Sequence, residues 1–426
     1  MKKLLFVLIA ILFAILVACS GNESGSGDGG SEEGNNSGSD SSGEKMQFYV
    51  SGDKVEGAAL TTMAEKYTEE TGTEIEVVDV PYDDMVTKIT NMMRAEEPPA
   101  LARVTGFNPA WQGKLMDLSD VAESNNVRAE MGITVEDELV APPLDLTAVG
   151  MFINKDLFEE AGVEYPTSED DIWTWEEFVD AVKTVTESTD AQYGMVMDNS
   201  EHRLNAFLYQ HGSKGFYQEG DEYTTNEETT EALQNFVELN DNTIMPTAVW
   251  TAGEDASSMF KSGRVAAYMS GSWQITDFAN NISDFEWESV YMPYEEVRAT
   301  NLGGNYIVGF EGSGQEEQAK EFIDWLYQKE NYEELATHGG YLPVTTDAEV
   351  EYEHAPEAYE IYQNEIANTD DIASQQRNEL VRKQLVSQRA LGSVLAEEMI
   401  NALNGEQDVE QAVENVKSQM TEAYVE

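Results

Sequence analysis

Two groups of side chains follow predicted strand ends, where an α/β protein can present them to a ligand. Asp53 and Lys54 come directly after the apolar run 46–50, and ligands of open α/β sheets bind beyond the carboxyl ends of the strands. Trp273 stands just past a predicted strand at 265–269, among small residues. Charged groups of this kind bind hydroxyls, and an indole face covers apolar C–H groups. These residues predict a binding site; the alternatives are a solvated turn for the first group and core packing for Trp273.

Signatures of catalysis and of metal binding are lacking in the sequence. Neither the spacing of the histidines nor a second thiolate supports a zinc site, and no nucleophile elbow, P-loop or Rossmann glycine run occurs. Among the 82 acidic residues, two could form the carboxylate pair of a glycosidase, but no feature of the sequence identifies such a pair. We therefore predict a binding protein, not an enzyme, without catalytic residues, metal or cofactor. The histidines are His202, His211, His338 and His354.

The elements that position Asp53 and Lys54 read as a β-α-β unit. After the strand 46–50, apolar residues recur at helical spacing from 59 to 67, Gly72 ends the helix, and a second strand covers 75–80. Strands that alternate with helices predict an α/β protein with an open parallel sheet.

Further elements follow from local signals. Thr174 and Glu177 fit a capping box, which assigns Trp175 to packing. Gly303-Gly304-Asn305 opens a strand at 306–310. The C-terminal part is predicted to be helical over 380–403, ending at Asn404-Gly405, and again over 409–420.

The N-terminus has the layout of an export signal. Lys2 and Lys3 precede an apolar run, which ends in Leu-Val-Ala before Cys19, the one cysteine of the chain. This tetrad resembles a bacterial lipobox. We therefore expect a signal peptide at 1–18 and lipidation of Cys19; the alternative is a cysteine that happens to end a signal peptide.

A spacer follows the signal. Residues 19–45 consist almost wholly of Ser, Gly, Asn, Asp and Glu, which cannot bury enough apolar area to fold. The folded body begins at Met46. Its length of about 380 residues is more than one core usually serves, which predicts two lobes.

The chain is strongly acidic. It has 24 Lys and Arg against 82 Asp and Glu, a formal charge of −58, and loss of the two signal lysines leaves 22 − 82 = −60. This sign excludes nucleic acid and anionic lipid as partners. Because the acidic residues are spread along the chain, we interpret them as adaptation to a saline (halophilic) or alkaline exterior; the alternative is a trap for cationic ligands.

Several segments, in order along the chain, resemble one family. The chain is similar to the family 1 extracellular solute-binding proteins of carbohydrate ABC transporters, and most similar to the maltose/maltodextrin type. Met-Phe-Ile-Asn-Lys-Asp-Leu-Phe-Glu-Glu-Ala-Gly at 151–162 is the most typical segment. The other matching segments are 48–54, 67–72, 175–178, 260–268, 271–273, 319–322, 340–343 and 400–405.

The resemblance implies a two-lobed, periplasmic-binding-protein-like (type II) α/β fold that closes on its ligand through a hinge. It places the crossings between lobes near Thr147, Asn305 and Tyr341. The implied lobes are 46–146 with 305–340, and 147–304 with 341–426.

The same resemblance implies the ligand-binding residues. Asp53 and Lys54 match a turn that binds hydroxyls, and Trp273 matches a stacking tryptophan. His202 and Arg203 match an aromatic and polar wall. Asp145 and Thr147 flank the position of a hinge carboxylate, and further candidates at the cleft edges are Thr105, Trp250, Asn305 and Tyr341.

Two departures from the maltose type concern the ligand. Residues 103–107 replace a Trp-x-x-Asp-Arg stretch, and no aromatic residue stands at Leu391-Gly392, where the family has a second stacking tryptophan. A maltodextrin, another oligosaccharide and a glycoside therefore all stay open.

The implied function is that of a monomeric lipoprotein on the extracellular face of the cell membrane. It would capture an oligosaccharide by lobe closure and deliver it to a membrane permease coupled to a cytoplasmic ATPase. The alternatives are a receptor for a cation such as a polyamine or ferric iron, a surface glycosidase, and a purely structural surface protein.

Overall fold

The computed structural model describes residues 45–54, 56–369 and 372–425. The predicted signal peptide, the lipidation site at Cys19 and the spacer up to residue 44 lie outside the described residues. Within the described residues, no helix has the length and hydrophobicity needed to cross a membrane.

The first β-α-β unit is confirmed. β1 (Met46–Val50) pairs in parallel with β2 (Ile75–Asp79) and with β3 (Leu101–Val104). α1 (Ala59–Thr71) connects β1 and β2 and buries an apolar stripe against the sheet. It ends at Gly72, whose φ of 80° suits a residue without a side chain and whose N–H donates to the Thr68 carbonyl.

The sheet is mixed, and the predicted parallel sheet is wrong in this respect. Its strand order is β2-β1-β3-β12-β6-β10-β7, with β11 also paired to β6. β12 runs antiparallel to both β3 and β6, because the chain leaves the first strands through β6 and returns to them through β12. The later strands are β6 (Pro143–Asn154), β7 (Tyr193–Met197), β10 (Val265–Gly271), β11 (Trp287–Val290) and β12 (Leu302–Gly309).

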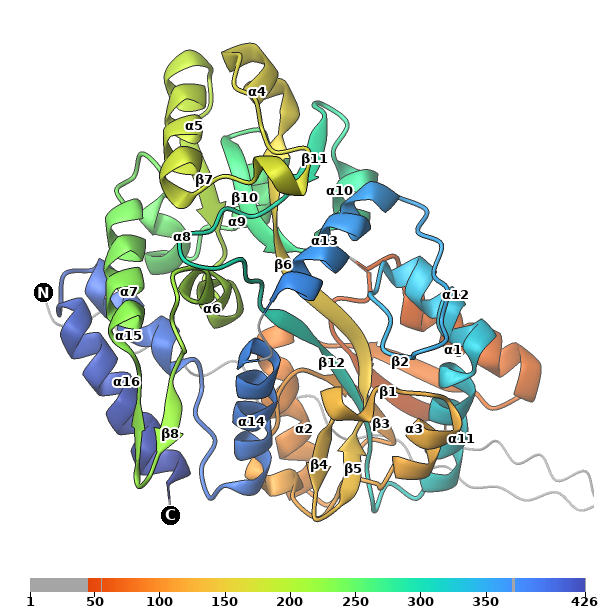
Figure 1. Cartoon of the computed structure of the whole chain (residues 1–426). Coiled ribbons are helices and arrows are strands. Elements are labelled where there is room, and N and C mark those ends of the chain that lie inside the picture. Colours follow the sequence, from red (N-terminus) through yellow and green to blue (C-terminus); the bar gives the residue numbers. More distant parts are fainter. Residues whose placement is uncertain (1–44, 55, 370–371, 426) are drawn as a thin grey trace, which may run out of the picture. The chain divides into compact units, whose positions relative to one another are not determined.

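β6 connects the two halves of this sheet. All of its residues are buried; residues 143–148 pair with β12, whereas 149–154 pair with β10 and β11. Leu146 also forms a bridge with Leu342. In Figure 1, β6 runs from the region of β1 and β3 to the region of β10. The strand thereby brings Asp145 and Thr147 to the middle of the sheet.

Helices cover the sheet (Figure 1), and of two small hairpins one lies against the sheet and the other against the C-terminal helix. The hairpins are β4 (Ile133–Val135) with β5 (Glu138–Ala141), and β8 (Tyr217–Glu219) with β9 (Glu222–Thr224). The helices are α2 (Met85–Arg94), α3 (Ser119–Ser124), α4 (Lys155–Ala161), α5 (Trp175–Ser188), α6 (Glu201–Gln210), α7 (Glu227–Leu239), α8 (Thr247–Thr251), α9 (Ala256–Lys261), α10 (Gln274–Asn281), α11 (Glu316–Tyr327), α12 (Lys329–Gly339), α13 (Pro356–Asn368), α14 (Ile372–Val386), α15 (Val394–Leu403) and α16 (Val409–Tyr424). Short 3₁₀ turns are η1 (Tyr82–Asp84), η2 (Pro109–Trp111), η3 (Ala129–Met131) and η4 (Glu169–Asp171).

The capping box at α5 is confirmed. Thr174 Oγ1 accepts from the Glu177 N–H at 3.2 Å, and the Glu177 carboxylate accepts from the Thr174 N–H at 2.8 Å. Trp175 packs in the core, 4.8 Å from the Phe207 ring, and its Nε1 donates to Gln210 Oε1 at 3.1 Å. The predicted structural role of Trp175 is therefore correct.

Two predicted elements differ from the structure. The strand predicted at 306–310 begins earlier, because 302–305 already pair with β6. The helix predicted over 380–403 is two helices, α14 and α15, separated at 387–393. Gly392 lies in this break, as expected from the low helix propensity of glycine, and the Tyr424 hydroxyl accepts from the Leu391 N–H at 3.1 Å.

The packing of α14 also differs from the predicted lobe boundary, which assigns 341–426 to the second lobe. Val381 and Leu385 belong to one apolar cluster with Phe107, Trp111 and Tyr306. α14 contacts β4, η2 and β12. Val381 and Leu385 of α14 are thus buried against residues of the predicted first lobe.

Candidate functional site

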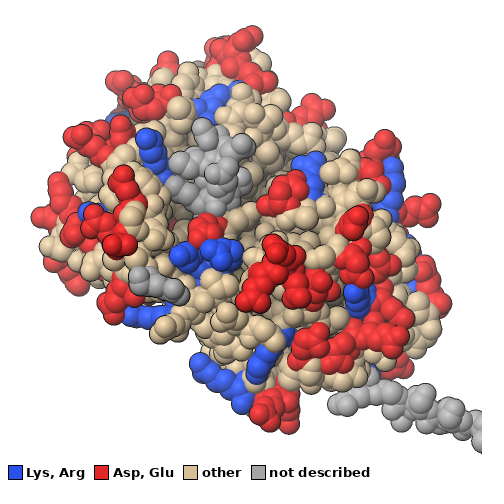
Figure 2. Space-filling model, turned by 60° about the horizontal axis from the view of Figure 1, so that its bottom comes forward, with Lys and Arg blue, Asp and Glu red and all other residues tan. Residues whose placement is uncertain are grey.

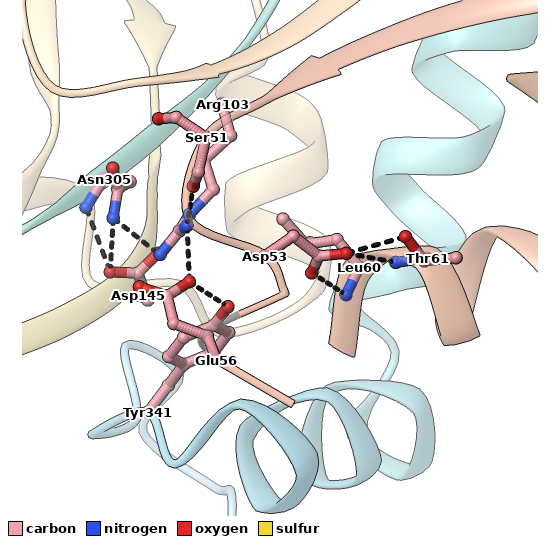
Figure 3. A network of polar contacts seen from close by, with 9 residues as sticks. All are labelled: Ser51, Asp53, Glu56, Leu60, Thr61, Arg103, Asp145, Asn305 and Tyr341. Carbon is pink, nitrogen blue, oxygen red and sulfur yellow. Dashed lines mark hydrogen bonds and ion pairs between the residues drawn. The ribbon is translucent and has the colours of Figure 1, made fainter. Parts of the chain in front are cut away.

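A buried ionic network lies where β3, β6 and the β1–α1 loop meet (Figure 3). Its centre is Arg103 of β3, whose side chain is 1% exposed. Arg103 Nε donates to Asp145 Oδ2 at 2.9 Å, and Nη2 lies 2.8 Å from the same oxygen. Arg103 Nη1 donates to Glu56 Oε2 at 2.6 Å and to the Ser51 carbonyl at 3.0 Å. One guanidinium therefore bridges two carboxylates.

Tyr341 and Asn305 complete this network. The Tyr341 hydroxyl donates to Glu56 Oε2 at 2.8 Å, and its ring centroid is 5.2 Å from the Arg103 guanidinium carbon. Asn305 Nδ2 donates to both oxygens of Asp145, at 3.0 and 3.1 Å. The network thus joins the β1–α1 loop, β3, β6, β12 and the segment after α12.

Burial and the charges of the partner side chains have opposing effects on the pKa values of this network. It raises the pKa of Glu56, an effect that Arg103 opposes and the Asp145 charge reinforces. Burial also acts against the charged form of Arg103, but the carboxylates of Asp145 and Glu56 outweigh it and raise the pKa of Arg103 well above its usual value. The guanidinium is therefore charged at every physiological pH.

The structure brings together three of the predicted ligand-binding residues, Asp145, Asn305 and Tyr341, whose ligand contacts stay predictions, and it adds two residues that were not predicted. Arg103 entered the sequence analysis only as part of the departure at 103–107, and Glu56 follows the turn in which Asp53 and Lys54 were singled out. Because no strand was predicted at 101–104, nothing in the sequence indicated that Arg103 is buried and needs charged partners.

Asp53 and Lys54 have structural contacts in the β1–α1 loop. Asp53 is buried; Oδ1 accepts from the Leu60 N–H at 2.7 Å, and Oδ2 accepts from the N–H and the hydroxyl of Thr61, at 3.1 and 2.7 Å. Lys54 is exposed and pairs with Asp79 at 3.6 Å. Asp53 therefore holds the first turn of α1, and the ligand contacts predicted for both residues stay predictions.

A second group of predicted residues gathers around Trp273. This partly buried tryptophan follows β10 and precedes α10. The Arg203 guanidinium carbon lies 4.5 Å from the Trp273 ring centroid, and the His202 ring lies 5.8 Å away. His202 in turn is held by Asn301, whose Nδ2 is 2.8 Å from His202 Nδ1 and donates to the His202 carbonyl at 2.9 Å.

Two glycines make room for these rings. A Cβ on Gly271 would overlap the six-membered ring of Trp273, and a Cβ on Gly303 would lie 2.7 Å from His202 Cε1 and from Thr147 Oγ1. Real Cβ atoms do not come this close, so both rings occupy space that any other residue would fill. Thr147 is thereby placed beside His202, and the ligand contact predicted for each stays a prediction.

A cavity of about 260 Å³ adjoins His202. Its polar lining includes Thr105, Glu201, His202 and Asn301. Thr105 directly follows β3, Glu201 and His202 belong to α6, and Asn301 directly precedes β12. Leu391 and Gly392, where the resemblance to the maltose type would place a second stacking tryptophan, line it as well. The apolar remainder of the lining includes Phe216, Leu380, Leu395, Val416 and Met420. A second cavity, of about 230 Å³, is lined by Asp145, Gly303 and Asn305.

Trp250 lies in the core instead of in either cavity. Its ring packs 4.8 Å from Phe236, and its Nε1 donates to the Met197 carbonyl at 3.2 Å. The ligand contact predicted for Trp250 stays a prediction.

Glu201 is a buried acid in the wall of the first cavity. Its Oε1 accepts from the Ala396 N–H at 3.1 Å, in the first turn of α15. Burial raises the pKa of Glu201 to about 7, although the backbone N–H groups of Ala396 and Leu395 oppose the shift. The carboxyl group thus changes charge near neutral pH.

This pKa predicts a pH dependence of stability. The folded protein holds the Glu201 proton more tightly than the unfolded chain, whose value is near 4.5. The free energy of unfolding should therefore fall as pH rises from about 4.5 to 7, by at most about 3 kcal/mol. Glu201→Gln should remove this part of the fall, measured by urea denaturation at pH 4.5 and pH 8.

Glu406→Gln, on an exposed residue just after α15, is the matched control, because Glu406 is not among the groups that shift the pKa of Glu201. An equal pH dependence in Glu201→Gln and the parent protein would contradict the assignment.

Among the residues that the structure describes, no three His, Cys, Asp or Glu side chains are grouped so that they could hold a metal ion. The binding chemistry available at Trp273, His202 and the first cavity includes ring stacking and hydrogen bonding.

Comparison with known proteins gives a consistent assignment. Residues 62–360 match the family described as bacterial extracellular solute-binding protein. An arabinooligosaccharide-binding protein of Halalkalibacterium halodurans is 27% identical over 288 residues, which cover 63% of each chain. A lactose-binding protein of Rhizobium radiobacter is 25% identical over 219 residues, or 49% of this chain and 50% of its own. The chain thus spans about half to two thirds of the length of these curated relatives.

Solved structures share the fold. Maltose-bound MalE3 of T. maritima aligns with a TM-score of 0.70 at 19% identity, covering 88% of this chain and 98% of its own. An ABC substrate-binding protein from Listeria monocytogenes in complex with cycloalternan aligns with a TM-score of 0.70 at 20% identity, covering 89% and 98%. These alignments confirm the predicted α/β fold. The match over most of the sequence shows that this chain belongs to the bacterial extracellular solute-binding proteins.

Proposed function

We propose that this protein binds an oligosaccharide against Trp273 and His202 and delivers it to an ABC importer. The observation that carries the proposal is the partly buried Trp273 ring, which packs against Gly271 beside His202, while His202 lines the first cavity together with other polar groups. Indole stacking on the apolar side of a sugar ring, with amides and hydroxyls for its hydroxyl groups, is the chemistry that saccharide recognition needs. The names of the relatives support this ligand class.

The proposal includes lobe closure around β6 and β12. The lobes are those predicted from the sequence, except that α14 packs with the first. The network around Arg103 connects segments of both predicted lobes, since it includes Glu56 of the first and Tyr341 at a crossing. It is therefore placed to be a fixed point about which the lobes move.

The proposed lipid anchor and extracellular location are based on the sequence alone. Lipidation at Cys19 and a polar spacer would hold a monomeric receptor at the extracellular face of the membrane, within reach of a permease. Labelling of cells with an alkyne-tagged palmitate should tag the parent protein and not Cys19→Ala; equal labelling of both would contradict the anchor.

The cationic alternative has less support. Acidic side chains are spread over the face shown in Figure 2, with basic ones among them, instead of concentrated at one place. The relatives with named ligands bind saccharides and are binding proteins, which also favours binding over glycoside hydrolysis.

A thermal-shift screen tests the proposal. The panel is maltose to maltohexaose, arabinobiose to arabinohexaose, lactose, spermidine and ferric citrate, in molar salt. A saccharide at 100 times its Kd should add about 2.7 kcal/mol to the free energy of unfolding. A shift with spermidine or ferric citrate alone would overturn the proposal, as would release of monosaccharides during incubation.

The close packing of the Trp273 and His202 rings against Gly271 and Gly303 gives a further prediction. Gly303→Ala should lower saccharide affinity about tenfold or more, because the new Cβ displaces His202. Calorimetric titration with the saccharide that gives the largest thermal shift measures the effect. Gly194→Ala is the control, since its Cβ would lie 2.8 Å from Val182 in the core; it should lower Tm and keep the affinity. Equal affinities for Gly303→Ala and the parent protein would show that the position of His202 against Gly303 does not contribute to saccharide binding.

A further inference from the structure

We propose that Arg203 and Asp198 are positioning residues for Trp273, and that Trp273 therefore offers a single face to one sugar ring. In this arrangement the Asp198–Arg203 ion pair holds the guanidinium against one face of the indole. The inference rests on the proposed saccharide site and specifies how that site is built. It assigns Asp198 a role that the sequence did not indicate, and it changes the predicted role of Arg203 from ligand contact to support.

Asp198 is fixed by the strand that leads to Trp273. It follows β7, and its carboxylate accepts from the Tyr268 hydroxyl at 2.8 and 2.9 Å and from Ser270 Oγ at 3.4 Å. Tyr268 and Ser270 belong to β10 and are fully buried. Gln274 Nε2, in the residue after Trp273, also donates to the Tyr268 hydroxyl at 3.3 Å. Asp198 is thus tied to both sides of Trp273 along the chain.

Arg203 connects the fixed carboxylate of Asp198 to the indole of Trp273. Its Nη2 lies 3.0 Å from Asp198 Oδ2, and its Nη1 donates to Ser200 Oγ at 3.0 Å. With both terminal nitrogens engaged and the side chain 17% exposed, the guanidinium plane has little freedom. Its carbon lies 4.5 Å from the Trp273 ring centroid, within the range of a cation–π contact.

Two sides of the Trp273 ring are consequently taken. Arg203 covers one face, and the six-membered ring sits against the backbone at Gly271, where a Cβ would overlap it. We assign the sugar ring to the face opposite Arg203. Both terminal nitrogens of Arg203 already have oxygen partners, and only its buried Nε has no hydrogen-bond partner among the described residues. We therefore assign the effect of Arg203 on the ligand to the indole.

A double-mutant cycle distinguishes positioning from direct contact. The ligand is maltotriose, arabinotriose or lactose, whichever gives the largest thermal shift, and Kd is measured by calorimetric titration. Arg203→Gln and Asp198→Asn should each weaken binding about fivefold or more in the parent protein. In the Trp273→Ala background neither should have a further effect, because the residue they position is gone.

The matched control is Arg298→Gln. Arg298 is 18% exposed, pairs with Glu169 and Glu365, and lies 5.4 Å from the Tyr291 ring, so it has the same chemistry away from Trp273. It should keep the affinity. A further fivefold loss on Arg203→Gln in the Trp273→Ala background would overturn the inference and show direct contact with the sugar, while leaving the saccharide function intact.

A spectroscopic measurement tests the inference without ligand. The fluorescence of Trp273, obtained as the difference between the parent protein and Trp273→Phe, should change in intensity and wavelength with Arg203→Gln and Asp198→Asn, and stay unchanged with Arg298→Gln. An unchanged difference spectrum in both variants would overturn the positioning role. If no saccharide binds the parent protein, the proposed function fails, and this spectrum still decides whether Arg203 orders the indole.

Discussion

Replacing Trp273 with alanine is expected to weaken saccharide binding by about 1–3 kcal/mol, with little change in the Tm of the ligand-free protein. The ring is partly buried, and its main contacts are Arg203, His202 and the backbone at Gly271. Its removal therefore takes away a stacking face without opening a large cavity in the core. Calorimetric titration and differential scanning calorimetry on the same samples measure the two effects.

Trp175→Ala provides the contrast. Trp175 is a core residue, so its truncation should cost about 3–5 kcal/mol of stability and leave the affinity of the folded protein unchanged. A large fall in Tm for Trp273→Ala, without loss of affinity, would assign Trp273 to packing.

Replacing Arg103 with alanine is expected to lower the free energy of unfolding by about 3–5 kcal/mol. The substitution leaves the Asp145 and Glu56 carboxylates close together and buried, without the cation that now bridges them. The loss thus reflects two uncompensated charges more than the value of the ion pairs themselves. Urea denaturation at neutral pH measures it.

Arg382→Ala is the control for Arg103→Ala. Arg382 forms an exposed pair with Glu379 three residues away, and such pairs contribute about 0–1 kcal/mol. If Arg103→Ala costs no more than Arg382→Ala, the network does not hold the β1–α1 loop, β3 and β6 together.

The sequence predicted well those elements that depend on neighbouring residues. The end of α1 at Gly72 and the capping box at α5 each need only a few consecutive residues, and both are confirmed. The mixed sheet was missed because the direction of β12 is set by pairing with β3 and β6, which lie far away in the chain. The break between α14 and α15 was missed because the apolar spacing continues across 387–393, while the Tyr424 hydroxyl binds the backbone there.

The candidate site also combines features that depend on neighbouring residues with features that depend on residues far away in the chain. The ends of β1 and β10 located Asp53 and Trp273, because strand ends can be read from local patterns. The partners of Arg103 cannot be read in this way: they lie 42 and 47 residues away, and Tyr341 lies 285 residues from Glu56. Asp198 was also missed, since a carboxylate after a strand is common in a chain with 82 acidic residues. Only its contacts with Tyr268 and Arg203 distinguish it.

The most direct test of the central claim is calorimetric titration of the parent protein and Trp273→Ala with maltotriose, arabinotriose and lactose. We expect the parent protein to bind at least one of these saccharides with a stoichiometry of one, and Trp273→Ala to bind it at least fivefold more weakly. Equal affinity of both proteins for the saccharide, or binding of spermidine and of no saccharide, would contradict a saccharide site at Trp273.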